Sequence, residues 1–371
     1  MKVIFTCGGT AGHVNPALAL AGYLREKDPN TAILFVGTPE GLEKKLVANA
    51  GYDYDAVEVS GFSRCLSWES LCHNLVTVKN LIAAPARAKA IIRAFQPDLV
   101  VGTGGYASYP VVKCAAGLGI PTAVHESNIV PGLTTKMLEN FADRIMVGFE
   151  DCRAHYSHPE KIVVTGTPVR GDFFALDRAQ AREKLGLTDD RPLLVSFWGS
   201  LGASTMNEKM LDFFACEVAE SQPFHHIHAV GSSGWEKMRQ ELAERGLTDC
   251  PGLDVREYIY DMATVMAAAD LVLSRAGAST VSELTALGKP AVMVPSPYVT
   301  NDHQNKNASI LARHGGAVVM AEQTLTGESL YQVSRDILLD ESMREEMSRG
   351  MASLGIRDAT ERLYDTVTAL L

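Results

Sequence analysis

Cys7-Gly8-Gly9-Thr10-Ala11-Gly12-His13 joins an apolar run to a helical pattern through a turn rich in glycine. The run before it, Val3–Cys7, is typical of a buried strand, and the pattern after it predicts a helix over Pro16–Lys27. A second unit of this kind holds the turn Trp198-Gly199-Ser200-Leu201-Gly202-Ala203, with a helix expected from about Ser204. Strand, turn and helix in this order open a doubly wound parallel sheet. The sequence therefore predicts an α/β fold of two Rossmann-like domains.

Short apolar runs alternate with helical patterns along the chain, which is typical of parallel sheets with right-handed crossovers. The predicted strands are Val3–Cys7, Ala32–Val36, Leu99–Gly102, Thr122–His125, Arg144–Val147, Lys161–Val164, Leu193–Phe197, His226–Val230, Leu271–Ser274, Ala291–Val294 and Ala317–Met320. We expect domains at residues 1–166 and 167–358, joined near Thr165-Gly166-Thr167-Pro168. The ligand is expected in a cleft where the two domains face each other, at the carboxyl ends of both sheets.

Composition limits the classes of function. The 371 residues are 46% hydrophobic and 21% charged, as in a globular protein. The net charge of −10 falls on the second half, because residues 1–165 hold 15 basic and 15 acidic residues. A nucleic-acid-binding protein is disfavoured, since it would need a basic surface. No apolar run approaches the ~18 residues of a membrane span. The N-terminal stretch Met1–Thr6 fits a strand and not a secretion signal.

The sequence gives little support for a metal site. The seven cysteines form no Cys-x-x-Cys pair, which favours reduced thiols in cytoplasm over disulfides or zinc. His225-His226-x-His228 is too closely spaced on a strand for one metal ion, because alternation sends neighbours to opposite faces. Asp53-Tyr54-Asp55 resembles the Asp-x-Asp metal motif of one class of sugar transferase, but we expect a solvated loop there. No obligatory metal or other cofactor is therefore expected.

The two glycine-rich turns are candidate phosphate sites. Glycines between a strand and a helix let backbone amides approach an anion, and the helix N-terminus adds partial positive charge. Each turn also fits a plain connection, but two in matching positions favour a ligand that carries phosphate. Neither contains the Gly-Lys-Ser/Thr of a P-loop. Neither is a Gly-x-Gly-x-x-Gly fingerprint, and no acidic residue ends the strand Ala32–Val36, so a nicotinamide-dependent dehydrogenase is disfavoured.

Polar side chains that follow predicted strands are the candidate catalytic groups. His13 is expected just before the helix that starts at Pro16, where the positive helix end favours a neutral imidazole suited to act as a base. A capping or core histidine is the alternative. His125-Glu126-Ser127-Asn128 ends a strand, so these side chains are expected to point into the cleft. Glu126 could orient an imidazole or accept a hydrogen bond from a loop amide.

Two polar stretches in the second half are candidate ribose and sugar sites. Ser274-Arg275-Ala276-Gly277-Ala278-Ser279-Thr280-Val281-Ser282-Glu283 runs from a strand into a helix, and Glu283 could accept two ribose hydroxyls. A capping box between Thr280 and Glu283 is the alternative. Asn301-Asp302-His303-Gln304-Asn305-Lys306-Asn307 places seven polar residues ahead of a helix. That is more than a simple turn needs, and it favours a grip on sugar hydroxyls.

A further stretch has apolar residues at helical spacing: Trp68, Leu71, Leu75, Val76, Val78, Leu81 and Ile82. Five basic residues accompany it between Gly61 and Gln96, against Glu69 alone: Arg64, Lys79, Arg87, Lys89 and Arg93. The stripe fits a helix that faces the core. It also fits a helix that docks on an anionic membrane surface.

Together these motifs resemble the MurG family, the bacterial glycosyltransferases of family 28 that convert lipid I to lipid II. The resemblance covers essentially the whole chain. It rests on Gly8-Gly9-Thr10-x-Gly12-His13-x-x-Pro16-Ala17-Leu18-Ala19, Gly104-Gly105-Tyr106, His125-Glu126-x-Asn128, Gly166-x-Pro168-Val169-Arg170, Gly199-Ser200-x-Gly202-Ala203, Arg275-x-Gly277-Ala278-x-Thr280-x-x-Glu283 and Gln304-x-x-Asn307-Ala308.

The resemblance implies a GT-B fold and an inverting transfer of N-acetylglucosamine from UDP-N-acetylglucosamine. The acceptor would be the 4-hydroxyl of lipid I, undecaprenyl-pyrophosphoryl-N-acetylmuramoyl-pentapeptide, and the product would be lipid II for peptidoglycan synthesis. A peripheral location on the cytoplasmic face of the plasma membrane is implied, at an anionic membrane surface and in association with a cell-wall synthesis complex. Amides, a helix dipole and arginine would hold the charge of the leaving UDP without a metal. The last helix, about Ala359–Leu371, is expected to pack back on the first domain.

The resemblance also implies roles for individual residues, with His13 as the candidate base. Ile259 would meet uracil through its backbone, Glu283 would take the ribose hydroxyls, and Gln304 would grip the sugar. Tyr258 would lie near the uracil. The full set implied for UDP-N-acetylglucosamine is Thr10, Ala11, Gly12, Asn128, Arg170, Ser200, Ile259, Ala278, Ser279, Thr280, Glu283 and Gln304. The set implied for the acceptor is Gly8, Gly9, Gly104, Gly105, Tyr106, His125 and Glu126.

The sequence departs from the family pattern at four positions. Ala11 and Trp198 stand where glycine is usual, and Ser127 and Leu201 stand where glutamine is usual. Leu201 removes a polar contact near the diphosphate. Two other functions are the alternatives. A related GT-B enzyme that adds a sugar to diacylglycerol would lack the first-half motifs around Tyr106 and Glu126. A non-catalytic nucleotide-sugar-binding subunit would usually carry only one of the two halves.

Overall fold

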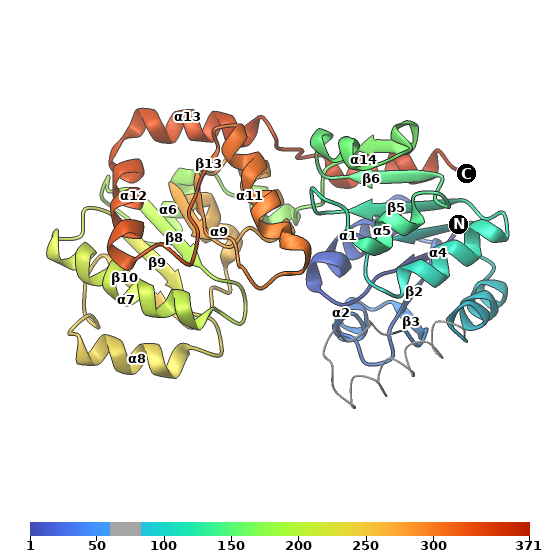
Figure 1. The fold of residues 1–371 in the computed structure, drawn as a ribbon, viewed down its shortest axis with the longest axis horizontal. Helices are drawn as coiled ribbons and strands as arrows, with labels where there is room; N and C mark the ends of the chain where they lie inside the picture. Colours follow the sequence, from blue (N-terminus) through green and yellow to red (C-terminus); the bar gives the residue numbers. More distant parts are fainter. Residues whose placement is uncertain (60–82) are drawn as a thin grey trace. The chain divides into compact units, whose positions relative to one another are not determined.

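The structure, a computed structural model, describes residues 1–59 and 83–371. Contacts divide the chain into two compact units, Met1–Pro168 with Ile356–Leu371, and Val169–Gly355. Each unit has one parallel sheet flanked by helices (Figure 1). The predicted α/β class with two Rossmann-like units is therefore confirmed. The whole apolar stripe from Trp68 to Ile82, with the basic residues Arg64 and Lys79, lies outside the described residues.

The first unit has a seven-stranded sheet in the order β3-β2-β1-β4-β5-β6-β7. The chain moves outward from β1 in one direction and from β4 in the other, so a topological switch point lies between these two neighbours. The strands are β1 (Lys2–Thr6), β2 (Ala32–Gly37), β3 (Asp53–Ala56), β4 (Leu99–Gly102), β5 (Thr122–Glu126), β6 (Arg144–Val147) and β7 (Ile162–Val164). The helices are α1 (Ala11–Lys27), α2 (Leu42–Asn49), a helix over 83–95, α4 (Ser108–Gly117), α5 (Leu133–Leu138) and α14 (Ala359–Thr368), with short 3-10 turns at Glu150–His155 and Pro159–Lys161.

The core of the first unit joins the two ends of the chain. Phe5 of β1 stacks on Phe35 of β2 with ring centroids 5.3 Å apart, and Leu20 of α1 packs in the same cluster. Leu363 and Val367 of α14 complete this cluster, and Figure 1 shows the C-terminal helix in the first unit. Full burial of such a side chain contributes roughly 1.5–3 kcal/mol. The C-terminal helix is thus part of the first unit's core.

The second unit has a six-stranded sheet in the order β10-β9-β8-β11-β12-β13, with its own switch point between β8 and β11. Its strands are β8 (Leu193–Phe197), β9 (His225–Ala229), β10 (Leu253–Arg256), β11 (Leu271–Ser274), β12 (Ala291–Met293) and β13 (Ala317–Val319). Its helices are α6 (Arg178–Lys184), α7 (Ser204–Ala219), α8 (Trp235–Glu244), α9 (Met262–Ala268), α10 (Ala278–Leu287), α11 (His303–Arg313), α12 (Gly327–Leu339) and α13 (Glu341–Ala352), with 3-10 turns at Gly171–Phe174 and Thr300–Asp302. The predicted start of a helix at Ser204 is confirmed.

Two strands that the sequence analysis did not predict lie at sheet edges. The predicted solvated loop at Asp53-Tyr54-Asp55 is wrong, because these residues form β3, which pairs in parallel with β2. Asp55 forms an exposed ion pair with Arg87. The other is β10, Leu253–Arg256, at the edge of the second sheet. Edge strands are short and only half covered, so their residues need not form the apolar run by which inner strands are predicted.

The three neighbouring histidines of β9 are divided between the two faces of the sheet, as strand alternation predicts. His226 Nε2 and His228 Nδ1 lie 2.7 and 2.6 Å from Ser196 Oγ, and all three side chains are fully buried. His226 Nδ1 lies 2.8 Å from Glu217 Oε2. His225 instead lies 2.7 Å from Asp189. The pair His226 and His228 therefore belongs to an internal polar network.

Candidate active site

The loops that follow β1 and β4 meet at the switch point of the first unit. Both strands end at the same edge of the sheet, with Thr6 paired to Gly102. Thr103 Oγ1 donates a hydrogen bond of 2.6 Å to the carbonyl oxygen of His13, which ties the second loop to the first. The motifs did not single out Thr103. Its only signal in the sequence is a hydroxyl directly before Gly104-Gly105.

His13 lies in the first turn of α1, because that helix begins at Ala11. The predicted helix start at Pro16 is wrong. Thr10 has an extended backbone with φ −138°, and the amides of His13 and Val14 already donate to its carbonyl oxygen. Pro16 sits inside the helix and removes only the one backbone bond that its missing N–H would have made.

The ring of His13 is oriented by its own loop. Its Nδ1 lies 2.8 Å from the carbonyl oxygen of Gly8. Because a carbonyl oxygen can only accept, Nδ1 carries the proton of the neutral ring, and Nε2 keeps its lone pair. The side chain is half-buried, so it is held in place without being sealed from substrate. An imidazole with this tautomer can remove a proton at Nε2.

Gly104 and Gly105 allow the second loop to approach the first. A Cβ on Gly104 would lie 2.6 Å from Cδ2 of His13, and one on Gly105 would lie 2.4 Å from the carbonyl oxygen of Gly8. Gly104 also has φ +110°, which favours glycine. The neighbouring Tyr106 is 60% exposed. The structure thus brings the predicted acceptor residues of both loops together around His13.

The polar residues at the end of β5 and directly after it are buried. The prediction that they point into the cleft rather than into the core is therefore wrong for His125, Glu126 and Ser127, which are at most 4% exposed. Glu126 accepts hydrogen bonds from the backbone N–H groups of Asn128 and Gly132 and from the Asn128 side chain. Glu126 therefore has the second of its two predicted roles: it accepts hydrogen bonds from loop amides and does not orient an imidazole. Of the four residues, Asn128 is the half-buried one.

His125 is buried at the end of β5. Its Nε2 donates to the carbonyl oxygen of Gly166, 3.1 Å away. Burial lowers the pKa of His125, and the bond to Gly166 and the negative charge of Glu126 oppose that shift only in part. His125 is therefore a neutral, buried neighbour of His13 and not a second exposed base.

In the second unit, α10 presents its N-terminus at the switch point. The first helical backbone bond runs from the N–H of Val281 to the carbonyl of Gly277, the N-cap residue. The N–H groups of Ala278, Ser279 and Thr280 precede that bond, as a site for a diphosphate requires. No side chain caps this helix, so the alternative capping box between Thr280 and Glu283 is wrong.

Glu283 and Arg170 form the charged part of this region. Burial raises the pKa of Glu283 to about 7, and the positive charge of Arg170 partly opposes the shift. The Arg170 guanidinium is exposed, lies 5.3 Å from the ring centroid of Phe173, and is 3.2 Å from the carboxylate of Asp172. An exposed guanidinium beside free helix amides can bind a diphosphate.

The remaining predicted donor residues of the second unit differ in exposure. Ser200 is exposed in the loop after β8, and Tyr258 is 44% exposed, whereas the side chain of Ile259 is buried, which leaves only its backbone for a ligand. The Oε1 of Gln304 accepts from the backbone N–H of Ser296 at 2.8 Å. Its amide nitrogen is the part left for a sugar hydroxyl.

The sugar grip predicted for the polar run 301–307 cannot involve all of its residues. Asn307 is 1% exposed, and its Nδ2 donates to the carbonyl oxygen of Ala276. The prediction of a sugar grip is wrong for Asn307, which supports the loop between β11 and α10. Asn301 and Asp302 have φ near +55°, a conformation that asparagine and aspartate adopt more readily than most residues. These two polar residues are therefore also explained by the turn before α11.

The four departures from the family pattern have different surroundings. Ala11 opens α1 and is not among the residues with positive φ, so a Cβ is accommodated there. Trp198 is buried in the core of the second unit, with the guanidinium of Arg275 5.8 Å from its ring centroid. Ser127 is buried as well, whereas Leu201 is 70% exposed in the turn after β8. Ala11 and Leu201 are therefore the two exposed departures, and Trp198 and Ser127 are the two buried ones.

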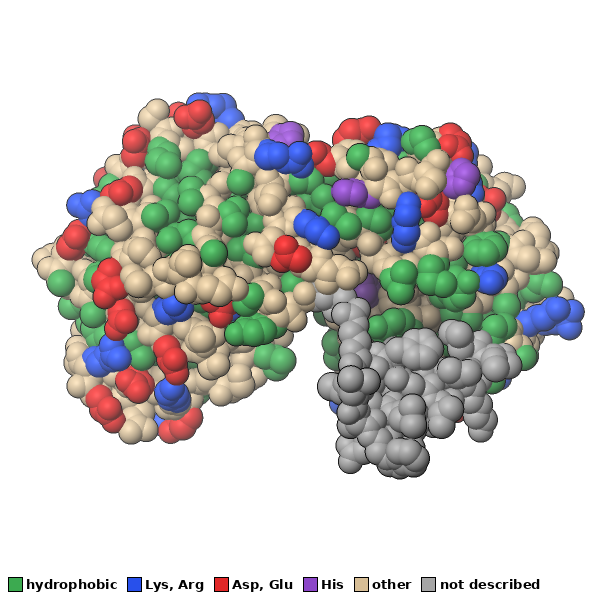
Figure 2. Space-filling model, viewed as in Figure 1, with side chains coloured by type: hydrophobic (Ala, Val, Ile, Leu, Met, Phe, Trp, Pro, Cys, Tyr) green, Lys and Arg blue, Asp and Glu red, His purple; other side chains and the backbone are tan. Residues whose placement is uncertain are grey.

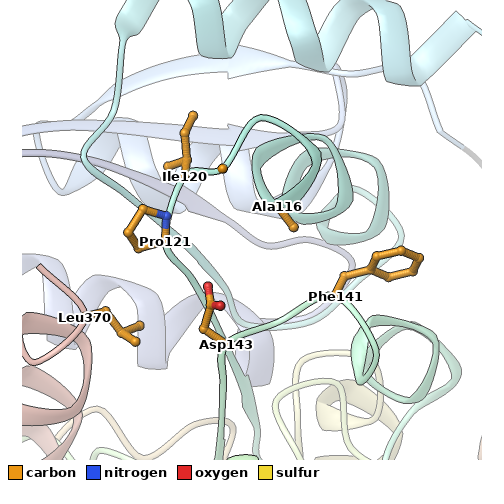
Figure 3. Close-up of a pocket in the computed structure, with 7 residues that line it drawn as sticks. Ala116, Ile120, Pro121, Phe141, Asp143 and Leu370 are labelled. Carbon is orange, nitrogen blue, oxygen red and sulfur yellow. The ribbon is translucent and has the colours of Figure 1, made fainter.

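A pocket of about 260 Å³ lies in the first unit, with Ile120, Pro121 and Asp143 among its lining residues (Figure 3). Ile120 and Pro121 precede β5 and Asp143 precedes β6, whereas the glycine loops follow their strands. Asp143 accepts from the backbone N–H and the hydroxyl of Thr122. This pocket is therefore separate from the region of His13. Within residues 1–59 and 83–371, no group of three His, Cys, Asp or Glu side chains is arranged to hold a metal ion.

Comparison with known proteins agrees with this geometry. Residues 3–147 match the glycosyltransferase family 28 N-terminal domain, and residues 193–363 match the glycosyltransferase family 28 C-terminal domain. The UDP-N-acetylglucosamine–N-acetylmuramyl-(pentapeptide) pyrophosphoryl-undecaprenol N-acetylglucosamine transferase of Acetivibrio thermocellus is 42% identical over 371 residues, which cover 100% of this chain and 98% of that protein. The transferase of the same name from Bacillus subtilis is 36% identical, over 100% of this chain and 99% of that protein. The crystal structure of Acinetobacter baumannii MurG has a TM-score of 0.78 and 28% identity, covering 99% of each chain.

Two parallel-sheet units with glycine turns at their switch points, matched by both family domains, define a glycosyltransferase of the GT-B class. The chain belongs to glycosyltransferase family 28, in the MurG group. The predicted resemblance is therefore confirmed, and a dehydrogenase is excluded by this membership.

Proposed function

We propose that this chain transfers N-acetylglucosamine from UDP-N-acetylglucosamine to the 4-hydroxyl of the N-acetylmuramoyl residue of lipid I, which gives lipid II. The observation that carries the proposal is the orientation of His13, whose Nδ1 lies 2.8 Å from the Gly8 carbonyl and whose Nε2 is thereby left basic. The names of the relatives with 42% and 36% identity support the choice of substrates.

In this proposal the first unit supplies the acceptor groups and the base. The acceptor hydroxyl loses its proton to Nε2 of His13, and the hydroxyl oxygen attacks the anomeric carbon from the face opposite to UDP. The new C–O bond forms as the bond between the anomeric carbon and the diphosphate oxygen breaks, so the configuration is inverted. The glycine loops at Gly8-Gly9 and Gly104-Gly105 would face the acceptor's pyrophosphate. A positioned base contributes roughly 10²–10⁴-fold to such a step.

The second unit would bind the donor and stabilise the leaving group. UDP departs with negative charge on its diphosphate, which the N–H groups of Ala278, Ser279 and Thr280, the helix dipole of α10 and Arg170 would hold. Glu283 would accept the ribose hydroxyls and the amide of Gln304 would donate to the sugar. These groups supply the electrostatic stabilisation without a metal, so we infer that no cofactor is obligatory.

A lipid acceptor requires the enzyme to work at a membrane surface, and we infer peripheral attachment on the cytoplasmic side. Within the described parts of the chain, no helix is long and apolar enough to cross a membrane. Leu133 and Met137 lie one turn apart on α5 and are 68% and 43% exposed. Phe141 follows at the same spacing, with the ammonium of Lys113 5.1 Å from its ring centroid. Apolar and basic side chains together suit an anionic lipid surface.

Figure 2 shows exposed hydrophobic side chains with basic ones between them on the visible face of the first unit. The double change Leu133→Glu and Met137→Glu should release the protein from vesicles that contain anionic lipid and leave its activity on a water-soluble acceptor analogue unchanged. Leu339→Glu, at a 46% exposed position of the second unit, is the control. Vesicle binding that survives the double change would leave the segment Trp68–Ile82 as the remaining candidate. Association with a cell-wall synthesis complex stays a prediction.

The acceptor class is tested by incubating the purified protein with radiolabelled UDP-N-acetylglucosamine, a lipid I analogue and EDTA. We expect label to move to the lipid I analogue with EDTA present. Transfer to diacylglycerol instead would support the related lipid glycosyltransferase. Donor binding without transfer to either acceptor would support a nucleotide-sugar-binding subunit.

A further inference from the structure

A buried carboxylate lies directly behind the glycine loop that carries His13. Glu43 occupies the first turn of α2, and its side chain is fully buried. Three glycines make room for it. A Cβ on Gly41 would lie 2.2 Å from both carboxylate oxygens, one on Gly37 would lie 2.7 Å from the Cγ of Glu43, and one on Gly8 would lie 3.0 Å from its Oε1. The absence of a side chain at these three positions thus leaves space for the carboxylate of Glu43.

The two oxygens of Glu43 join two different loops. Oε1 accepts from the backbone N–H of Thr38 at 2.9 Å and from its hydroxyl at 2.6 Å. Oε2 accepts from the backbone N–H of Gly9 at 3.2 Å. Burial by itself raises the pKa of Glu43, but the hydrogen bonds from Thr38 and Gly9 outweigh it, and the pKa lies below its ordinary value. The group is therefore an ionised acceptor at both oxygens.

No lysine or arginine in residues 1–59 and 83–371 forms an ion pair with Glu43. A buried carboxylate without a cation is costly unless hydrogen bonds compensate it. Neutral groups could join the loops at Thr38 and Gly9 with a smaller desolvation penalty. The position of the Glu43 carboxylate indicates its role. It accepts from the backbone N–H of Gly9, and the carbonyl oxygen of the preceding Gly8 accepts from Nδ1 of His13. The loop from Gly8 to His13 is thereby anchored at its start by Glu43.

We propose that Glu43 is a positioning residue for the transfer reaction, which holds the Gly8–Gly9 loop so that the Gly8 carbonyl fixes the ring of His13 with Nε2 toward the acceptor. This inference rests on the proposed function. Glu43 touches no reacting atom, so its effect acts through the loop. A misplacement of a catalytic group by about 1 Å can lower a rate by about 100-fold.

Glu43→Gln is the direct test, because it keeps the size of the side chain and removes one acceptor. Both Thr38 and Gly9 present N–H donors, and an amide can accept from only one side while its NH₂ group opposes the other. We expect kcat to fall about 10- to 100-fold, with the KM for UDP-N-acetylglucosamine unchanged. The acid side of the pH profile of kcat should also move, because the ring of His13 loses its fixed partner. Glu40→Gln, at an exposed glutamate three residues away, is the matched control and should leave all three quantities unchanged.

Gly41→Ala is a second variant that displaces the carboxylate without altering it. Gly41 has φ −70°, so alanine is compatible with the backbone, and the three atoms nearest to the new Cβ all belong to the carboxylate of Glu43. It should lower kcat with the same shift in the pH profile. This variant decides the question if Glu43→Gln does not fold. Loss of folding in both variants would make Glu43 a purely structural residue and overturn the inference.

The remaining outcomes are also decisive. Normal kcat in Glu43→Gln, with an active wild type, would overturn the role of Glu43 and leave the proposed function intact. A fall in kcat with an unmoved pH profile and weaker donor binding would indicate general damage, and would also overturn it. A wild type that binds UDP-N-acetylglucosamine but transfers nothing would instead refute the proposed function on which the inference rests.

Discussion

Gly104 packs against the ring of His13 so closely that a Cβ at this position would lie 2.6 Å from Cδ2 of the imidazole. Gly104→Ala should therefore push the ring away from the carbonyl of Gly8 and lower kcat by about 100-fold. Gly117→Ala in α4 is the control, because a Cβ there meets nothing within 4 Å. Steady-state kinetics of both variants, with UDP binding measured by calorimetry, make the test. Equal kcat in the two variants would show that the contact does not position His13.

The affinity for UDP should depend on pH through Glu283. Its pKa of about 7 means that the carboxyl of the free enzyme takes up a proton below neutral pH. Because ribose hydroxyls donate to the ionised form, affinity should fall as the pH drops, by up to about tenfold per pH unit below 7. Calorimetric titration of UDP between pH 8 and 5.5 measures this.

Glu283→Gln should remove that pH dependence and weaken UDP binding at pH 8 by about tenfold. It should also raise the melting temperature of the free protein at pH 8, because a buried charge is removed. Glu236→Gln, at an exposed site of the second unit, should change neither quantity. A pH dependence retained in Glu283→Gln would assign the effect to another group.

The buried network around Ser196 should make the second unit sensitive to acid. Burial lowers the pKa of His226 to about 3 and that of His228 well below its ordinary value. The unfolded chain therefore binds more protons at these residues below about pH 6.5, and stability is lost as the pH falls. Burial raises the pKa of Glu217, so its contribution has the opposite sign and falls as the pH rises above about 4.3. The two histidines outweigh the one carboxyl, and the net loss should be about 1 kcal/mol per pH unit between pH 6 and 5.

His228→Phe should flatten this dependence, because one histidine then balances one carboxyl. Urea unfolding at pH 7 and pH 5 is the measurement, followed by the fluorescence of Trp198 and Trp235 in the second unit. His158→Gln, at an exposed position of the first unit, should keep the wild-type dependence. An unchanged slope in His228→Phe would assign the acid sensitivity to other groups.

Leu201 offers a gain-of-function test at the donor site. The side chain is 70% exposed in the turn after β8, where the family usually has glutamine. Leu201→Gln should restore a hydrogen bond near the diphosphate and tighten UDP-N-acetylglucosamine binding, by roughly 0.5–1.5 kcal/mol. The melting temperature should stay constant, since nothing packs on an exposed side chain. Leu118→Gln, exposed in the first unit, should leave the affinity unchanged, and an unchanged affinity in Leu201→Gln would place this side chain away from the ligand.

Much of the fold could be predicted because inner parallel strands are apolar along their length. The runs Leu99–Gly102, Arg144–Val147, Leu193–Phe197 and Leu271–Ser274 are strands with the predicted bounds. The edge strand Asp53–Ala56 could not be found in this way, because its residues are polar and half-exposed.

The candidate site shows the same division between local and tertiary information. The identity of His13 follows from its loop, but its place inside α1 does not, since Pro16 is a stronger local signal for a helix start than Thr10. The sequence alone could not show whether Glu126 binds an imidazole or loop amides, because the answer depends on the loop that places the N–H of Gly132 next to its carboxylate. Glu43 could not be predicted at all, because a single glutamate forms no motif until Gly8 and Gly37 fold around it.

The central claim is that His13 is the base that removes the proton of the acceptor hydroxyl when N-acetylglucosamine is transferred to lipid I. Its most direct test is the rate of transfer from radiolabelled UDP-N-acetylglucosamine to a lipid I analogue, compared between wild type and His13→Gln at equal donor occupancy. We predict that the wild type forms the labelled disaccharide product, and that His13→Gln forms it about 10²–10⁴-fold more slowly with unchanged donor affinity. Equal rates in the two proteins, or no transfer to lipid I by the wild type, would contradict it.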